Sequence, residues 1–142
     1  MKFFIDSLSE AASLLEVKSG NKISIKVDII LGHDGSWSNV YNLWKQSNLK
    51  MSEGNRFIVT VDHAFPAPTI DDRVQQQKMA EISREKGIEL YNHGEGVLHQ
   101  VVAENVNLCQ GMIIVGADGH VATSGAFGAI AFSLSPEALV KV

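Results

Sequence analysis

Four short segments of the sequence place a histidine within two positions of an acidic residue. They are His33-Asp34, Asp62-His63, His93-Gly94-Glu95 and Asp118-Gly119-His120. A carboxylate beside an imidazole orients the ring and raises its pKa, which makes a general acid that can protonate a leaving hydroxyl. The residue types therefore predict acid–base chemistry, and Asp62 with His63 forms the first candidate pair.

The remaining histidine, His99, extends this prediction in two directions. If Asp118 reaches His99 across the fold, the two residues form a second carboxylate–imidazole pair. The alternative is a single zinc or iron ion held by imidazole and carboxylate groups from cooperating loops. Its ligands would be His93, Glu95, His99 and His120.

Each of these residues also has a purely structural explanation. Asp62 can cap a helix that starts near Thr69, and Asp118 followed by glycine favours a turn. His99 followed by Gln100 is typical of a half-buried histidine. It is the convergence of four such segments on one edge of the fold, rather than any one of them, that favours a functional site.

The candidate residues follow apolar runs that predict buried strands at 23–31, 57–61, 88–91 and 112–117. Helices are expected from a capping box at Ser7 and Glu10, at 37–45 after Ser36, from Thr69 to Gly87, at 124–129, and after Ser135-Pro136. Residues 97–102 fit a strand or a helix, and the Gly94-x-Gly96 turn before them favours a short helix. This alternation predicts an α/β fold with a mostly parallel sheet. Such sheets form ligand crevices at the carboxyl ends of their strands, where all four segments lie.

The composition limits the class of protein. The 142 residues fit one domain (residues 1–142), and 12 Lys and Arg against 16 Asp and Glu offer no basic field for nucleic acid. The single cysteine, Cys109, excludes an internal disulfide and a cysteine-ligated cluster held by this chain alone. The N-terminal residues lack the long apolar stretch of a signal peptide or a membrane span. We therefore expect a cytoplasmic protein with no membrane or nucleic-acid partner.

Four motifs, taken in order, resemble the N-terminal domain of the aconitase superfamily. They are Val27-Asp28-Ile29-Ile30-Leu31-Gly32-His33-Asp34-Gly35, Val61-Asp62-His63, Gly94-Glu95-Gly96-Val97-Leu98-His99-Gln100-Val101 and Val115-Gly116-Ala117-Asp118-Gly119-His120. Within that superfamily they resemble the large subunits of 3-isopropylmalate dehydratase and homoaconitase. The resemblance implies a three-layer α/β/α domain, the leading part of a larger architecture, beside a [4Fe–4S] active site. It also implies a hydro-lyase, of the kind used in leucine biosynthesis, that dehydrates and rehydrates a small hydroxy-carboxylic acid.

The same resemblance implies a role for each candidate residue. His63, with its partner Asp62, would protonate the departing hydroxyl. His99, Asp118 and His120 would line the pocket of the substrate and the cluster. The implied substrate-binding residues are His33, Asp34, Gln100 and Gly119.

Two departures from the family leave alternatives open. The family has a substrate-contacting serine where this chain has Gly119, and Cys109 matches none of the family's three cluster cysteines. We therefore expect no cluster ligand in this chain, and one wall of an active site that needs the remaining large-subunit domains or a small subunit. The alternatives are a non-catalytic domain that binds a small carboxylate or regulates a relative, and a mononuclear metal site built from the histidines. Because an isolated wall exposes apolar surface, a partner subunit or a homo-oligomer is expected.

Overall fold

The computed structural model describes residues 2–51 and 54–142, which fold around a five-stranded parallel sheet. The strands, in the order β3-β2-β1-β4-β5, are β1 (Ile29–His33), β2 (Arg56–Thr60), β3 (Glu89–Tyr91), β4 (Ile113–Gly116) and β5 (Ile130–Ser133). The helices are α1 (Lys2–Ala11), α2 (Asp34–Ser47), α3 (Ile70–Lys86), α4 (Leu98–Asn105), the 3-10 helix η1 (Val121–Phe127) and α5 (Pro136–Leu139). The predicted α/β class with a parallel sheet is confirmed.

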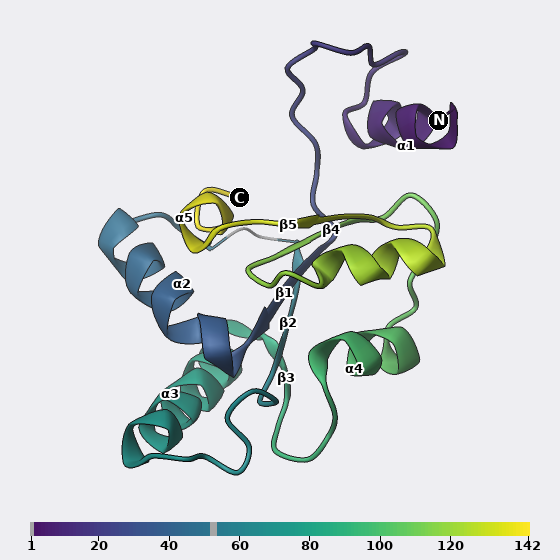
Figure 1. The fold of residues 1–142 in the computed structure, drawn as a ribbon. Helices are drawn as coiled ribbons and strands as arrows, with labels where there is room; N and C mark the ends of the chain where they lie inside the picture. Colours follow the sequence, from purple (N-terminus) through teal and green to yellow (C-terminus); the bar gives the residue numbers. More distant parts are fainter. Residues whose placement is uncertain (1, 52–53) are drawn as a thin grey trace.

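Helices cover both faces of this sheet, as Figure 1 shows. On one face α2 packs against α3 and α5, and on the other α4 packs against η1. The domain therefore has the three α/β/α layers that the family resemblance implied. Helix α1 lies outside these layers, at the far end of an extended segment that leads into β1.

Alternate residues of β1 pack into different parts of the core, because successive side chains of a strand point to opposite faces. Ile29 and Leu31 pack with Leu98 of α4, whereas Ile30 packs with Leu139 of α5. All five side chains are buried. The fully apolar sequence of β1 thus reflects burial on both faces, which is typical of the central strand of a parallel sheet.

Three predicted helix boundaries are confirmed. Thr69 Oγ1 accepts a hydrogen bond from Asp72 N at 3.1 Å at the start of α3, and Ser135 Oγ accepts one from Ala138 N at 3.2 Å at the start of α5. Gly87 ends α3 in the left-handed conformation, at a φ of 70°. These polar side chains satisfy backbone donors that a helix start leaves without a partner.

The helix predicted from Ser7 is wrong at its start. Helix α1 begins before Ser7 and ends at Ala11, so Ser7 lies inside the helix. Ser9 Oγ donates a hydrogen bond to Ile5 O at 2.8 Å and accepts one from Val17 N at 3.0 Å. Ser9 thus shows that a serine inside a helix can bond the carbonyl one turn back. Ser7 also lies inside the helix, so the capping-box spacing did not locate the helix start.

The strand predicted at 23–31 begins only at Ile29. Residues 23–27 do alternate between more exposed and less exposed side chains, but the ladder starts where Ile29 pairs with Arg56 and Ile114. Asp28 still bonds both neighbours, since its N–H donates to Ile113 O and its carbonyl accepts from Arg56 N. In the described part of the chain, residues 23–27 pair with no strand and stay outside the sheet. At its other end β1 continues to His33, which places the first candidate histidine on the strand itself.

Two helix predictions and one missed strand complete the corrections. Helix α2 begins at Asp34, with His33 at its N-cap position, so Ser36 lies in the first turn and does not cap. The helix expected at 124–129 is the 3-10 helix η1, which begins at Val121. Residues 130–133 were not predicted as a strand, but they form β5 because β4 offers its backbone for pairing.

Candidate acid–base site at the carboxyl edge of the sheet

The carboxyl ends of β1 and β4 meet where the chain reverses its direction of winding. The connections from β1 to β2 to β3 pass through α2 and α3 on one face of the sheet. The connections from β3 to β4 to β5 pass through α4 and η1 on the other. The loops therefore diverge between β1 and β4, and open parallel sheets bind ligands at this switch point. His33 ends β1 and Asp118 follows β4, so both lie there.

The first carboxylate–imidazole pair lies in the loop after β2. Asp62 Oδ1 is 2.7 Å from His63 Nδ1, and Asp62 Oδ2 accepts a hydrogen bond from Leu98 N at 2.6 Å. The carboxylate is 3% exposed, whereas the imidazole is 51% exposed. Asp62 therefore binds the first turn of α4, instead of capping the helix after Thr69, while it holds one nitrogen of an open imidazole.

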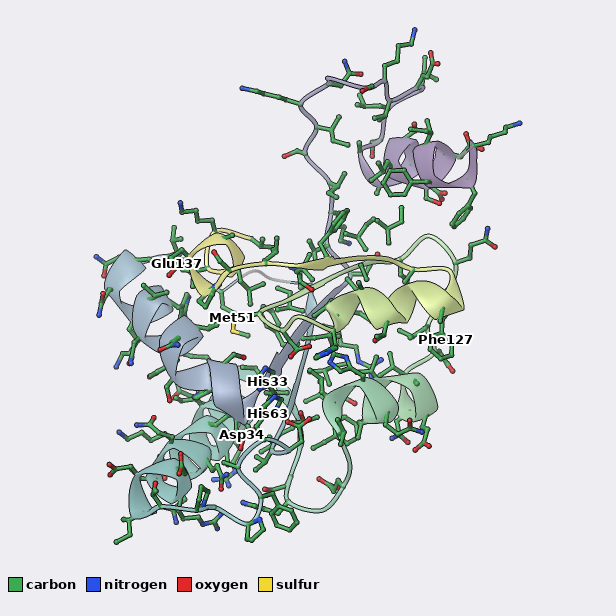
Figure 2. The ribbon with its side chains drawn as sticks, viewed as in Figure 1. His33, Asp34, Met51, His63, Phe127 and Glu137 are labelled. Atoms are coloured by element: carbon green, nitrogen blue, oxygen red, sulfur yellow. The ribbon has the colours of Figure 1, made fainter. Side chains whose placement is uncertain are left out.

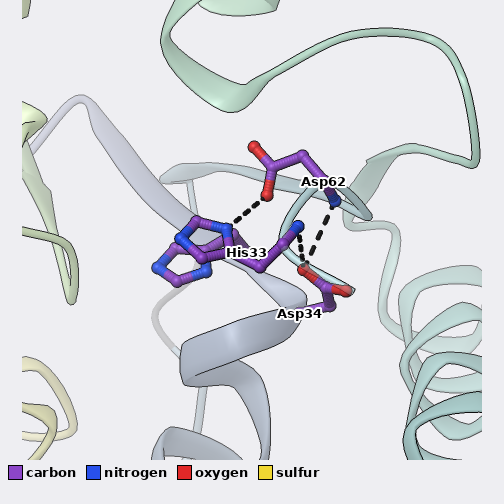
Figure 3. Close-up of side chains that lie close together, drawn as sticks. His33, Asp34 and Asp62 are labelled. Carbon is purple, nitrogen blue, oxygen red and sulfur yellow. Dashed lines mark hydrogen bonds and ion pairs between the residues drawn. The ribbon is translucent and has the colours of Figure 1, made fainter. Parts of the chain in front are cut away.

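Asp34 holds the backbone of the same loop (Figure 3). Its Oδ1 accepts hydrogen bonds from Asp62 N and His63 N at 3.3 and 2.9 Å, and its Oδ2 accepts from Ala64 N and Gln76 Nε2 at 3.0 and 3.1 Å. Burial raises the pKa of Asp34, but these hydrogen bonds outweigh burial and hold the pKa below its ordinary value. Asp34 thus positions the loop that carries His63, and its implied contact with substrate stays a prediction.

His33 lies beside His63, as Figure 2 shows. Its ring stacks on that of His63, with centroids 3.8 Å apart and planes inclined by 18°, and its Nε2 lies 3.4 Å from Asp118 Oδ2. The side chain is only 8% exposed. Burial and the charge of His63 lower the pKa of His33, although Asp118, Asp62 and Asp34 act in the opposite direction. The structure therefore favours a neutral His33 that contacts both His63 and Asp118.

Asp118 does reach His99 across the fold. Asp118 Oδ1 lies 2.7 Å from His99 Nε2 and accepts a hydrogen bond from His120 N, also at 2.7 Å. Burial raises the pKa of Asp118, but the hydrogen bonds from His120 N and His99 hold it below its ordinary value. The side chains of Asp118 and His99 are 9% and 22% exposed, and that of His120 is 78% exposed. A second carboxylate–imidazole pair thus lies beside an open histidine.

The metal-ligand set predicted from the sequence is not brought together. His93 Nε2 lies 2.6 Å from Arg73 Nη1 and 3.0 Å from Gln76 Oε1, while the Glu95 carboxylate accepts a hydrogen bond from Asn92 N. Both side chains are thereby engaged apart from the other histidines. Among the described residues, the groups whose potential ligand atoms lie within 4.8 Å of one another are His33, Asp34, Asp62 and His63, and His99, Asp118 and His120.

Two residues of the implied substrate-binding set lie on the surface of the domain. The Gln100 side chain donates to Glu104 one turn along the exposed side of α4. At Gly119 no atom lies within 4 Å of the position a Cβ would take, so a serine there would meet open space. The contacts of both residues with substrate stay predictions.

Gln76 is the one clear omission of the sequence analysis. It is 3% exposed, and its Nε2 donates to Asp34 Oδ2 at 3.1 Å and to Ala64 O at 2.8 Å, so it fixes the loop after β2. A run of three glutamines hides it in the sequence. Its helical spacing from Met79 and Ser83, the other buried residues of α3, is the signal that could have identified it.

The residues present do not fit an iron–sulfur cluster held by this chain alone. Such a cluster needs several cysteine thiolates, and Cys109 is the only cysteine of the sequence. It is exposed and precedes β4, so it lies at the amino end of that strand, away from the histidines. The acid–base residues are therefore what this chain contributes to chemistry at the edge. Separately, no helix among residues 2–51 and 54–142 has the length and apolar character needed to cross a membrane.

The fold and the edge together define a class of protein: a doubly wound α/β domain with two carboxylate–imidazole pairs at its switch point. Comparison with known proteins then identifies the family. The model of the aconitase family (aconitate hydratase) matches residues 6–141. The chain belongs to the aconitase family.

Its curated relatives include large subunits of two enzymes. The chain is 34% identical to the probable methanogen homoaconitase large subunit of Methanothermobacter thermautotrophicus, over 95% of this chain and 33% of the relative. It is 31% identical to 3-isopropylmalate dehydratase large subunit 1 of Thermotoga maritima, over 80% of this chain and 27% of the relative. A third relative, the 3-isopropylmalate dehydratase large subunit of Mycolicibacterium smegmatis, is 31% identical over 95% and 32%. The chain thus spans about a third of the length of these relatives.

Proposed function

We propose that this chain supplies the acid–base wall of a hydro-lyase active site of the homoaconitase or 3-isopropylmalate dehydratase type. The observation that carries the proposal is the Asp62–His63 pair, in which a buried carboxylate holds an exposed imidazole at 2.7 Å. Because Nδ1 of His63 is engaged by Asp62, Nε2 is the ring nitrogen left for a substrate. A proton on Nε2 passes to the substrate hydroxyl as its bond to carbon breaks, and water leaves.

The second pair has a supporting role in this proposal. Asp118 holds His99 Nε2 at 2.7 Å and the backbone N–H of His120 at the same distance, so the exposed ring of His120 lies beside a fixed carboxylate–imidazole pair. The exposed ring of His120 can donate an N–H to a carboxylate of a hydroxy acid and hold its hydroxyl near His63. We assign removal of the carbon-bound proton to residues outside this chain.

The proposal includes the partners and the compartment. The relatives are named large subunits and are about three times as long as the aligned part, so we propose that further large-subunit domains and a small subunit complete the site. A [4Fe–4S] cluster would then be held by those parts and would act as a Lewis acid on the substrate. A cytoplasmic enzyme is supported by the free, exposed thiol of Cys109, which suits a reducing compartment.

A grafting experiment tests the proposal. This chain replaces the matching 27% of the Thermotoga maritima large subunit, and the graft is assembled with the small subunit of that enzyme. We expect dehydration of a 2-alkylmalate, and a loss of at least about 100-fold in kcat when His63 is changed to Asn, the usual contribution of a general acid. His93→Gln, outside the two pairs, should keep the activity of the graft.

The outcomes separate the two functional classes. An assembled graft with its full cluster absorbance and no activity would contradict the proposal, as would equal rates with and without His63. Calorimetry of that inactive graft with malate-like acids then distinguishes the runner-up: heat of binding without turnover indicates the non-catalytic carboxylate-binding domain. Gly119, which removes a hydroxyl from the edge, is the observation that favours this second candidate.

A further inference from the structure

The three residues around Asp118 have the composition and spacing of a metal site. Asp118 Oδ1 lies 2.7 Å from His99 Nε2 and 3.6 Å from His120 Nδ1, and potential ligand atoms of all three side chains lie within 4.8 Å of one another. A tetrahedral zinc ion with bonds of about 2.0 to 2.2 Å separates its ligand atoms by about 3.4 Å. The two distances to the carboxylate fall on either side of this value, so side-chain rotations alone could close the site.

Two of these side chains are held by the core and the third is exposed, which is an arrangement that lets a metal ion enter. Asp118 is 9% exposed and follows the buried strand β4, and His99 lies in the first turn of α4, so both are fixed by the core. His120 is 78% exposed, and within the described part of the chain its ring makes no hydrogen bond. A pair held by the core with one exposed third ligand leaves an open path for an ion from solvent.

A second layer of contacts orients the carboxylate. The other oxygen of Asp118, Oδ2, faces His33 Nε2 at 3.4 Å, and His33 is held by its stack on His63. In metal sites the ligating carboxylates are themselves held by outer polar partners, and loss of such a partner typically lowers metal affinity by about 10- to 100-fold. His33 thus belongs to the site without being a ligand.

We propose that His99, Asp118 and His120 bind one divalent transition-metal ion, of which Zn²⁺ is the best fit, with the remaining coordination positions open to water. Two imidazoles and one carboxylate favour Zn²⁺ or Fe²⁺ over Mg²⁺ and Ca²⁺, which prefer oxygen ligands. The ion would take the place of the hydrogen bond between His99 and Asp118. The Asp62–His63 pair lies outside this group and keeps its own contacts.

Zinc titration by calorimetry tests this inference on the 142-residue chain freed of metal with a chelator. We expect one Zn²⁺ per chain and no heat with Mg²⁺. His120→Ala and Asp118→Asn should each weaken Zn²⁺ binding by at least 10-fold, and His33→Asn by about 10- to 100-fold. His93→Gln, which removes a histidine outside the group, should bind as the unsubstituted chain does.

Several outcomes would overturn the proposal. They are the absence of Zn²⁺ binding to the unsubstituted chain, unchanged affinity in both His120→Ala and Asp118→Asn, and a loss in His93→Gln equal to that in His120→Ala. Circular dichroism establishes that each variant is folded, and His120 is so exposed that its replacement leaves the core intact. No substrate is present in the titration, so its result is independent of whether the graft is a hydro-lyase.

Discussion

The two carboxylate–imidazole pairs have the same chemical groups, but the fold brings those groups together in different ways. Asp62 and His63 are neighbours in one loop, and their imidazole is 51% exposed. Asp118 and His99 are 19 positions apart in the chain and come from two different elements, and their imidazole is 22% exposed. The first pair therefore depends on the conformation of one loop, whereas the second depends on the distance between β4 and α4.

The two constructions are nevertheless joined. The carboxylate that holds His63 also accepts the hydrogen bond of Leu98 N, one residue before His99. His33 contacts His63 through its ring face and Asp118 through Nε2. A change in one pair can therefore reach the other through α4 or through His33, and substitutions can measure how far it does.

The largest effect is expected from Gly116→Ala, which disturbs the close contact between β4 and β1 that positions Asp118 of the second pair. A Cβ at Gly116 would lie 2.6 Å from Leu31 O and 2.9 Å from Val121 Cγ2, so β4 and β1 would have to separate. We expect a loss of about 1 to 3 kcal/mol in the free energy of unfolding by urea. The imidazole NMR signals of His99 should shift more than those of His63.

Gly119→Ala is the matched control, because its Cβ would meet no atom within 4 Å. If Gly116→Ala and Gly119→Ala had the same urea midpoint, close approach of the two strands would not be what positions Asp118.

A smaller effect is expected from Asp62→Ala, which removes the acceptor for Leu98 N at the start of α4. The free energy of unfolding should fall by about 1 kcal/mol, as for other helix caps. His63→Ala leaves that bond in place, and its ring is 51% exposed, so it should change stability by less than about 0.5 kcal/mol. Equal losses in the two variants, measured in urea, would mean that Asp62 stabilises the fold only through His63.

The loss of stability at low pH should depend on Asp34. Its pKa is lowered in the folded chain, so its contribution is present above the ordinary carboxyl range and is lost as pH falls through the folded pKa. Asp34→Asn cannot titrate, and its stability should therefore fall less steeply below pH 4. Urea midpoints measured from about pH 6 down to about pH 2.5 show this difference. Parallel curves for the two proteins would contradict the assignment.

The smallest effect on stability is expected from Gly119→Ser. The added hydroxymethyl group enters open space beside Asp118, so the free energy of unfolding should change by less than about 0.5 kcal/mol. In the graft, the same substitution should strengthen binding of a hydroxy acid, because it restores a hydroxyl donor at the edge of the second pair. Weaker binding, measured by calorimetry, would show that a side chain at position 119 interferes with the hydroxy acid.

Features that depend on local contacts were predicted from the sequence, whereas features that depend on contacts between distant elements were not. Thr69, Gly87 and Ser135 were predicted as helix boundaries and are confirmed, because each acts within one turn of the chain. Strand β5 and the true start of β1 were missed, because pairing depends on where β4 and β2 begin. The polar group Gln76 was missed for the same reason: its bonds to Asp34 and Ala64 cross between elements.

The sequence by itself determined the α/β class, the family and the grouping of histidines and acids at the carboxyl ends of strands, because apolar runs and the residues that follow them are local patterns. Only the tertiary structure decided which of those groups meet. It separated His93 and Glu95 from the remaining histidines and joined Asp118 to His99. The physical reason is that the strand order brings β1 and β4 together from distant parts of the chain, and hydrogen bonds form only between groups that the fold places within about 3 Å.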